Sequence, residues 1–296
     1  MFKRPKIGLA LGGGGARGLA HIGVLKIFEE ENIPIDIITG TSVGSVIGGM
    51  YAQNPSIKYV ENKMRQFIAS KEFKKTGIDH VIKKQSNENL FTQITENIKE
   101  RIVINIACSR KSMVNNKRIK IAIDSLLEPG NIQDTAIKFG VAASDLISGQ
   151  GFLFTEDDIV TAIVASSSIP GFLPPIEIDN RILLDGVITD PVPIKPAHKL
   201  GAKVVIAVNV SPDLVIQKNF ANIIDIMIRH NQMTGDAYNN ILLEDADVVI
   251  RPNVGAYHWA EFNNIDYMIK AGEKAATEAI VKIKKITRRR FYYFRG

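Results

Sequence analysis

The stretch KIGLALGGGGARGLAHIGVLKIFEE, residues 6–30, places four consecutive glycines between an apolar strand and a helix. Residues 6–12 form a nearly continuous apolar run, which is typical of a buried parallel strand. Within a regular element each glycine costs about 0.5–1 kcal/mol relative to alanine, so four together indicate a close backbone approach or a positive φ. In both cases backbone N–H groups are exposed at the start of a helix, and such a position is favourable for an anion.

Strand and helix patterns alternate along much of the remaining chain. Apolar runs of strand length recur at residues 35–40, 137–144, 151–155, 181–185, 203–210 and 246–252. Helical patterns occupy residues 42–54, 157–168 and 193–201. This alternation predicts a parallel sheet covered by helices on both faces. The predicted fold class is therefore α/β, a three-layer α/β/α sandwich with a mostly parallel central sheet and a helical insertion.

The predicted insertion covers residues 56–128, which contain Lys-rich amphipathic helices and no strong strand signal. We interpret it as part of a single domain of residues 5–212. Residues 213–287 are predicted to form a mainly helical C-terminal part that packs on the same domain. Residues 288–296 form a basic, aromatic tail.

The composition is typical of a folded globular protein, with 45% hydrophobic and 23% charged residues in a chain of 296. The N-terminal apolar run is too short for a signal peptide, and no stretch approaches the roughly 18 apolar residues of a membrane-spanning helix. The single cysteine, Cys108, excludes an internal disulfide framework and indicates a reducing compartment. We therefore expect a cytoplasmic protein. Because no His/Cys/Asp cluster has metal-ligand spacing, no metal or organic cofactor is expected.

Basic residues are concentrated at the C-terminus. The formal net charge is +6, but residues 282–296, KIKKITRRRFYYFRG, contain seven basic residues and no acidic one. The rest of the chain is nearly neutral, with 30 basic and 31 acidic residues. A solvated terminus and a peripheral contact with an anionic membrane both fit this pattern of positive charges and aromatic rings. No nucleic-acid partner is expected.

The glycine loop by itself fits more than one kind of site. Gly13, Gly15 and Gly18 match G-x-G-x-x-G, the pattern of a dinucleotide-binding loop. That pattern needs an acidic residue at the end of the second strand, whereas Asp36 precedes most of that strand. A P-loop is excluded because no Lys-Ser or Lys-Thr pair follows the glycines.

The sequence GTSVG, residues 40–44, lies between a strand and a helix, which is the context of a nucleophile elbow. Gly40 and Gly44 leave room for a sharp turn that lifts the Ser42 hydroxyl above the sheet at a helix N-terminus. The alternative is that Ser42 is an ordinary N-cap in a glycine-rich turn. Adjacent parallel strands would bring this turn and the glycine loop together at the carboxyl edge of the sheet, which favours the nucleophile.

A nucleophilic serine needs a base. His198, His230 and His258 follow Ser42 in the chain, but none of them stands at a strand end or in a glycine-rich setting. Asp185 ends an apolar strand and precedes Gly186. A carboxylate at that position could accept the serine proton directly, as a two-residue dyad. The alternative is an ordinary Asp-Gly turn.

Four motifs, taken in order, resemble those of the patatin-like phospholipases. They are GGGARG (residues 13–18), GTSVG (residues 40–44), ASSSIPGFLPP (residues 165–175) and Asp185-Gly186. The resemblance covers residues 5–70 and 130–212 and implies a patatin-like fold in which Ser42 is the nucleophile and Asp185 the base. It assigns the oxyanion hole to Gly13, Gly14, Gly15, Arg17 and Gly18. Val187 departs from the Asp-Gly-Gly or Asp-Gly-Ala of the family, which affects the shape of the pocket.

The resemblance implies a serine acyl hydrolase whose substrates are phospholipids or lysophospholipids. Two alternatives stay open at this point. The first is an acyltransferase or thioesterase that uses the same dyad with another acceptor. The second is a non-catalytic, lipid-binding regulatory protein that keeps the fold.

Overall fold

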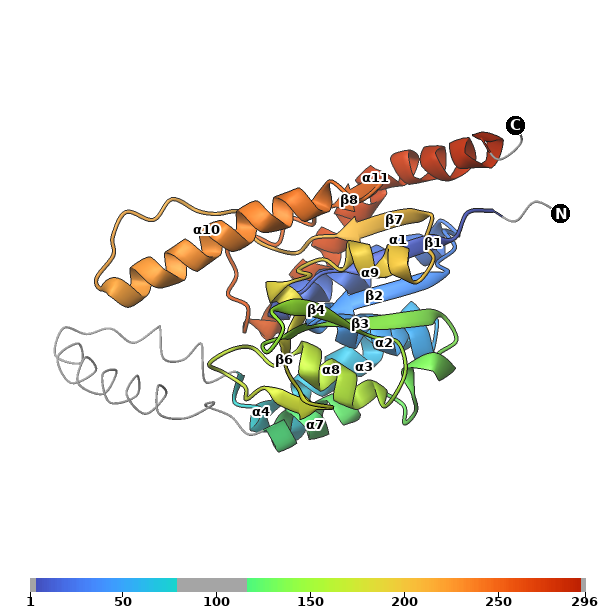
Figure 1. The fold of residues 1–296 in the computed structure, drawn as a ribbon. Helices are drawn as coiled ribbons and strands as arrows, with labels where there is room; N and C mark the ends of the chain where they lie inside the picture. The colour runs from blue at the N-terminus through green and yellow to red at the C-terminus, as the bar shows by residue number, and fades with distance from the viewer. Residues whose placement is uncertain (1–3, 79–115, 294–296) are drawn as a thin grey trace.

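The computed structural model describes residues 4–78 and 116–293. Its centre is an eight-stranded sheet with the strand order β5-β6-β3-β2-β1-β7-β8, and β4 pairs with β3 beside this path (Figure 1). The strands are β1 (Ile7–Leu11), β2 (Ile37–Thr41), β3 (Lys138–Asp145), β4 (Gln150–Phe154), β5 (Ile176–Ile178), β6 (Arg181–Asp185), β7 (Val204–Val208) and β8 (Val248–Ile250).

The strand directions divide the sheet into a parallel and an antiparallel part. β3, β2, β1, β7 and β8 are parallel to one another in that order. β4 and β6 pair antiparallel with β3, and β5 pairs antiparallel with β6. The predicted α/β fold with a mostly parallel sheet is confirmed. The antiparallel edge was not foreseen, because the apolar pattern of a strand carries no information about its direction.

Helices cover both faces of the sheet. The α-helices are α1 (Ala20–Glu30), α2 (Val43–Gln53), α3 (Ile57–Ala69), α4 (Lys71–Lys75), α7 (Asn116–Asp124), α8 (Ile159–Ser166), α9 (Ile194–Lys199), α10 (Ile223–Leu243) and α11 (Ile265–Tyr293). Short 3-10 helices are η1 (Gly15–Leu19), η2 (Ile132–Asp134), η3 (Gly186–Ile188) and η4 (Phe262–Asn264).

The residues of β1 show how the two layers differ. Ile7, Leu9 and Leu11 point into the main core, which they share with α1, α2, α8 and α11. Ala10 lies in the smaller core on the other face, with α9 and the end of α10. Gly8 faces the same side, and a Cβ there would lie 2.7 Å from the Cβ of Ala202. Large residues therefore alternate with small ones because the α9 layer approaches the sheet more closely.

The predicted insertion and C-terminal part add helices around this sandwich. Between residues 56 and 128 the structure describes α3, α4 and α7, while residues 79–115 lie outside the described part. α3 packs against α1, and α7 packs against α8. α11 packs along α1, and its backbone stays helical into the basic tail as far as Tyr293. Within the described ranges, residues 4–78 and 116–293, no helix combines the length and the apolar character that crossing a bilayer requires.

Candidate active site

Ser42 occupies a sharp turn between β2 and α2. Its backbone has a φ of 53° and a ψ of −126°, a conformation that a residue with a side chain adopts only under strain. The turn needs glycine on both sides. A Cβ at Gly40 would lie 2.4 Å from the Cα of Ser45, and a Cβ at Gly44 would lie 2.2 Å from the carbonyl oxygen of Leu11. The strained turn is typical of a nucleophile elbow.

Strand β3 brings Ser42 and Asp185 together. Along one edge of β3, Ala142 pairs with Thr41 at the end of β2, and the next residue, Ala143, pairs with Asp185 at the end of β6. Because β6 runs antiparallel to β3 and β2 runs parallel to it, the two strands end facing each other. The Oγ atom of Ser42 donates a hydrogen bond of 2.8 Å to Oδ2 of Asp185.

Asp185 is only 2% exposed. Its other oxygen, Oδ1, accepts a hydrogen bond of 2.9 Å from the backbone N–H of Val187. Burial raises the pKa of Asp185 to about 6, against the weaker opposing effects of the hydrogen bonds from Val187 and Ser42. The group is therefore mostly ionised at neutral pH but close to its titration range, which suits a general base.

Two serines hold the elbow in place. The backbone N–H of Ser42 donates to Oγ of Ser166 at 2.8 Å, and this hydroxyl donates to the carbonyl oxygen of Ala142 at 2.6 Å. The hydroxyl of Ser45 donates to the carbonyl oxygen of Ser42. Ser166 belongs to the ASSSIPGFLPP motif, to which the sequence assigned no function. Its position shows that this motif ties the elbow to β3.

The glycine loop lies against Ser42, but only part of it can donate to a ligand. The N–H of Gly13 donates to the carbonyl oxygen of Pro191 at 3.0 Å, and the N–H of Ala16 donates to that of Trp259 at 2.6 Å. Within the described ranges, no acceptor pairs with the amides of Gly14 and Gly15. A Cβ at Gly13 would lie 3.3 Å from the Cβ of Ser42. The two free amides directly follow Gly13, the residue that approaches Ser42.

The other residues of the loop make further contacts. The amide of Gly13 is already occupied, so this residue serves the close approach to Ser42. Gly18 lies inside η1, where a Cβ would come within 2.2 Å of Cγ1 of Val43. Arg17 donates from Nε to the carbonyl oxygen of Gly14 at 3.1 Å, so its side chain clamps the loop.

His21 also supports the loop, and the sequence reasoning missed it. Its Nε2 lies 2.8 Å from the carbonyl oxygen of Gly12, so Nε2 carries the proton and donates. The ring is fully buried, Nδ1 has no hydrogen-bond partner among the described residues, and burial lowers the pKa to about 4. His21 is therefore neutral at physiological pH. The sequence did contain a signal for this role, because His21 follows the glycines within two helical turns and lies on the apolar face of α1.

The three histidines considered from the sequence have partners other than Ser42 and Asp185, or are exposed. His198 contacts the carbonyl oxygens of Ala202 and Asp245, and the ring of His258 contacts the amide of Ala260. His230 is exposed on α10. Among the residues that the structure describes, neither Ser42 Oγ nor the Asp185 carboxylate has a histidine partner. The same part of the chain contains no His/Cys/Asp/Glu group arranged to hold a metal ion.

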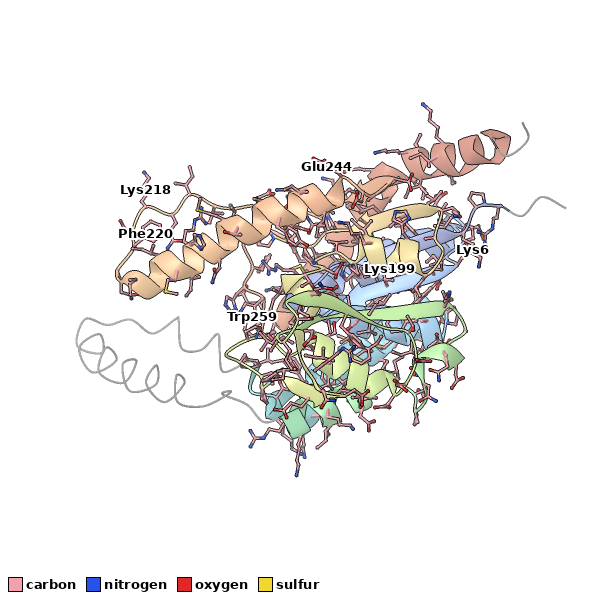
Figure 2. All side chains as sticks on the ribbon, viewed as in Figure 1. Lys6, Lys199, Lys218, Phe220, Glu244 and Trp259 are labelled. Atoms are coloured by element: carbon pink, nitrogen blue, oxygen red, sulfur yellow. The ribbon has the colours of Figure 1, made fainter. Side chains whose placement is uncertain are left out.

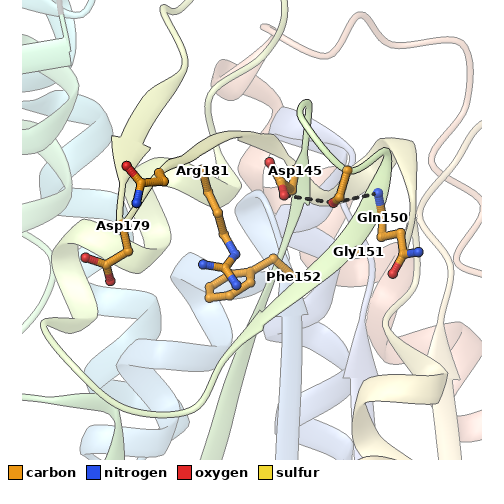
Figure 3. A pocket seen from close by; sticks show the side chains of 8 residues that line it. Asp145, Gln150, Gly151, Phe152, Asp179 and Arg181 are labelled. Carbon is orange, nitrogen blue, oxygen red and sulfur yellow. Dashed lines mark hydrogen bonds between the residues drawn. The ribbon is translucent and has the colours of Figure 1, made fainter.

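A separate hollow of about 430 Å³ opens between the β3–β4 and β5–β6 turns (Figure 3). Its labelled lining residues are Asp145, Gln150, Gly151, Phe152, Asp179 and Arg181. Arg181 lies over the ring of Phe152 at 4.9 Å. Neither Ser42 nor Asp185 lines this hollow, so it is distinct from the dyad.

Comparisons with known proteins match the part of the chain that contains Ser42 and Asp185. The family model for patatin-like phospholipases matches residues 9–198. A patatin-like phospholipase domain-containing protein of Caenorhabditis elegans is 32% identical to this chain over the matched region. That region is 69% of this chain but only 13% of the length of the relative. An uncharacterised NTE family protein of Mycobacterium tuberculosis is 30% identical over 70% of this chain and 49% of its own length. The solved structure of VipD from Legionella pneumophila gives a TM-score of 0.48 at 11% identity, over 94% of this chain and 66% of that one.

Proposed function

The chain belongs to the patatin-like phospholipase family, and we propose that it is a serine acyl hydrolase that cleaves acyl esters of phospholipids or lysophospholipids. The observation that carries this proposal is the hydrogen bond from Ser42 Oγ to the buried carboxylate of Asp185. The family name supports a lipid ester as the substrate. The pKa of Asp185, which is near 6, supports its role as the general base.

The first half of the proposed reaction acylates Ser42. The Oγ atom attacks the ester carbonyl carbon while its proton moves to Oδ2 of Asp185. The negative charge that develops on the carbonyl oxygen is stabilised by the amides of Gly14 and Gly15 and by the N-terminus of α2. When the ester C–O bond breaks, the Asp185 proton passes to the departing alcohol oxygen, and the acyl group stays on Ser42.

The second half regenerates the enzyme with water. Asp185 accepts a proton from the water molecule as the water oxygen attacks the acyl carbon. The same two amides stabilise the second tetrahedral intermediate. When this intermediate collapses, the proton returns from Asp185 to Ser42 Oγ and the fatty acid leaves. Every proton transfer uses Asp185, so no histidine is needed.

The test is hydrolysis of a soluble chromogenic acyl ester by purified protein. Ser42→Ala and Asp185→Asn should each lose at least about 10³-fold in kcat, because the two residues act as a unit. Ser148→Ala and Asp179→Asn change the same residue types at the separate hollow and should keep parental activity. Circular dichroism checks that all four variants fold. Activity of Ser42→Ala within tenfold of the parent protein would contradict the mechanism.

Two alternatives have distinct outcomes in the same preparation. An acyltransferase or thioesterase would use the same dyad, and would transfer the acyl group to an added alcohol or would prefer a thioester. A non-catalytic lipid-binding protein would fail to react with a fluorophosphonate probe at Ser42. We expect labelling at Ser42 and water as the principal acceptor.

A further inference from the structure

Helix α10 presents an apolar face to solvent. Its exposed large apolar side chains include Ile223, Ile226, Met227, Met233, Tyr238 and Ile241. Each of these positions is three, four or seven residues from another member of the set, so the side chains lie on one side of the helix. Ile223 at the beginning is 72% exposed and Ile241 near the end is 64% exposed. Exposed apolar side chains therefore occur on this side from the beginning of the helix to near its end, over a length of about 30 Å.

The contacts of α10 fix this face outward. Near the end of the helix, Asn239, Leu242 and Leu243 are buried against the body. Residues 211–222 run along the polar side, where Arg229 donates to the carbonyl oxygen of Val215 at 3.0 Å and the amide of Ala221 donates to Asp225 at 2.8 Å. Because the buried anchor and this loop occupy the other sides, the apolar face remains exposed within the described part of the structure.

The first half of α10 and residues 211–222 form an arm that extends away from the sheet (Figure 1). Lys218 and Phe220 lie at its outer end, whereas Glu244 lies at its base (Figure 2). Lys6, just before β1, lies on the opposite side of the molecule in this view, so the arm extends past the carboxyl end of the sheet. The outer loop adds exposed apolar side chains of its own, Val215, Ile216 and Phe220.

The apolar face also reaches the rim of the candidate active site. The hydroxyl of Tyr238 donates to the carbonyl oxygen of Thr189 at 3.0 Å. Thr189 directly follows η3, the short helix that begins after Asp185. Val187 and Ile188 in η3 are exposed. Exposed apolar side chains therefore extend from beside the dyad to the tip of the arm.

We propose that the apolar face of α10, with the tip of the arm, binds the surface of a lipid bilayer and holds the dyad against it. This inference rests on the proposed function, because a lipid ester is presented in such a surface. Residues 211–243 carry two basic and three acidic side chains, so attraction to anionic headgroups contributes little. The binding energy comes from apolar burial, as for amphipathic helices that lie in a membrane interface. A second protein copy on this face would instead cover the rim of the active site.

The experiment uses the full chain carrying Ser42→Ala, so that the vesicles are not hydrolysed. Binding to vesicles of zwitterionic phosphatidylcholine is measured by co-sedimentation at low and at high salt. We expect binding that changes little with salt. Ile223→Asp/Met227→Asp on the apolar face should weaken it at least tenfold. Ile121→Asp is the matched control, since Ile121 is an exposed apolar residue on α7. In the background with Ser42 intact, both variants should hydrolyse a soluble ester as the parent does.

The outcomes separate this proposal from the proposed function. Equal binding by the α10 variant and the Ile121 control would contradict the proposal that α10 binds a membrane surface. The absence of any binding of the parent protein to phosphatidylcholine would contradict it as well. A concentration-dependent dimer that the α10 variant abolishes, without any loss of vesicle binding, would assign the face to a second copy and also overturn it. Normal vesicle binding together with no hydrolysis of the soluble ester would contradict the proposed function and leave the lipid-binding face supported.

Discussion

Ser42 and Asp185 lie 143 positions apart in the chain, and their side chains share a hydrogen bond of 2.8 Å. The hydroxyl and the carboxylate meet because the strands that precede them end opposite consecutive residues of β3. The carboxylate lies in a buried site, so we expect its protonation to affect both the proposed reaction and the pH dependence of stability.

The rate of ester hydrolysis should follow the ionisation of Asp185. Burial raises the pKa of this group to about 6, and only the ionised form can accept the Ser42 proton. We expect kcat to rise with pH, to reach half its maximum near pH 6 and to level off above about pH 7. The measurement is kcat for a soluble ester whose own groups do not titrate between about pH 4.5 and 8. A rate that is constant over this range would contradict the assignment of Asp185 as the base.

Asp185 and His21 should affect the pH dependence of stability in opposite directions. The pKa of Asp185 is raised from 3.8 to about 6, so the stability from its protonation is complete below pH 3.8 and lost as pH rises through 6. The pKa of His21 is lowered from 6.5 to about 4, so the stability from its neutral form is complete above pH 6.5 and lost as pH falls through 4. The two effects offset each other over nearly the same range.

Single substitutions should therefore reveal each contribution. Compared with the parent protein, Asp185→Asn should lose more stability as pH falls from about 6.5 to 4, because only the His21 effect remains. His21→Gln should lose less, because only the Asp185 effect remains. The free energy of unfolding, measured with urea at several pH values, gives both differences. If the free energy of unfolding changed with pH in the same way for the parent and both variants, neither group would titrate as the structure indicates.

Gly15→Ala should slow the reaction by disturbing the glycine loop. Gly15 has a φ of 58°, and a Cβ there would lie 2.3 Å from the carbonyl oxygen of Trp259, which already accepts from Ala16. We expect kcat to fall about 10²–10³-fold, as when an oxyanion donor is lost. Gly149→Ala is the matched control, with a φ of 71° and open space around its Cβ position. A fall of the same size in Gly149→Ala would assign the effect to backbone strain in general.

Deletion of residues 288–296 should weaken binding to anionic vesicles. Four of the seven C-terminal basic residues are removed, and each contributes about 1 kcal/mol near an anionic surface. The loss should be large at low salt and small at high salt, whereas binding to phosphatidylcholine through α10 should remain. Hydrolysis of a soluble ester should not change. Equal binding of the truncated and full chains to anionic vesicles at low salt would make this terminus an ordinary solvated end.

Local sequence patterns predicted much of the fold and marked the two residues of the proposed dyad. The apolar run of β1, the four glycines and the helix that follows are adjacent in the chain, so their structure depends on nearby residues. The same holds for the GTSVG turn, where Gly40 and Gly44 identify the sharp bend around Ser42. Asp185 was recognisable because it ends an apolar run before a glycine. These features are local, and local sterics and apolar periodicity determine them.

The tertiary structure alone decided which groups meet and which remain free. The directions of β4 and β6 follow from pairing with β3, which an apolar pattern does not specify. Gly13 and Gly14 look alike in the sequence, yet only Gly13 donates to Pro191, so hydrogen bonds between distant segments determined which amides can face an oxyanion. The apolar pattern of α10 resembles that of a buried helix. Its face is exposed because Leu242 and Leu243 anchor another side and residues 211–222 cover the polar side, and these contacts exist only in the folded chain.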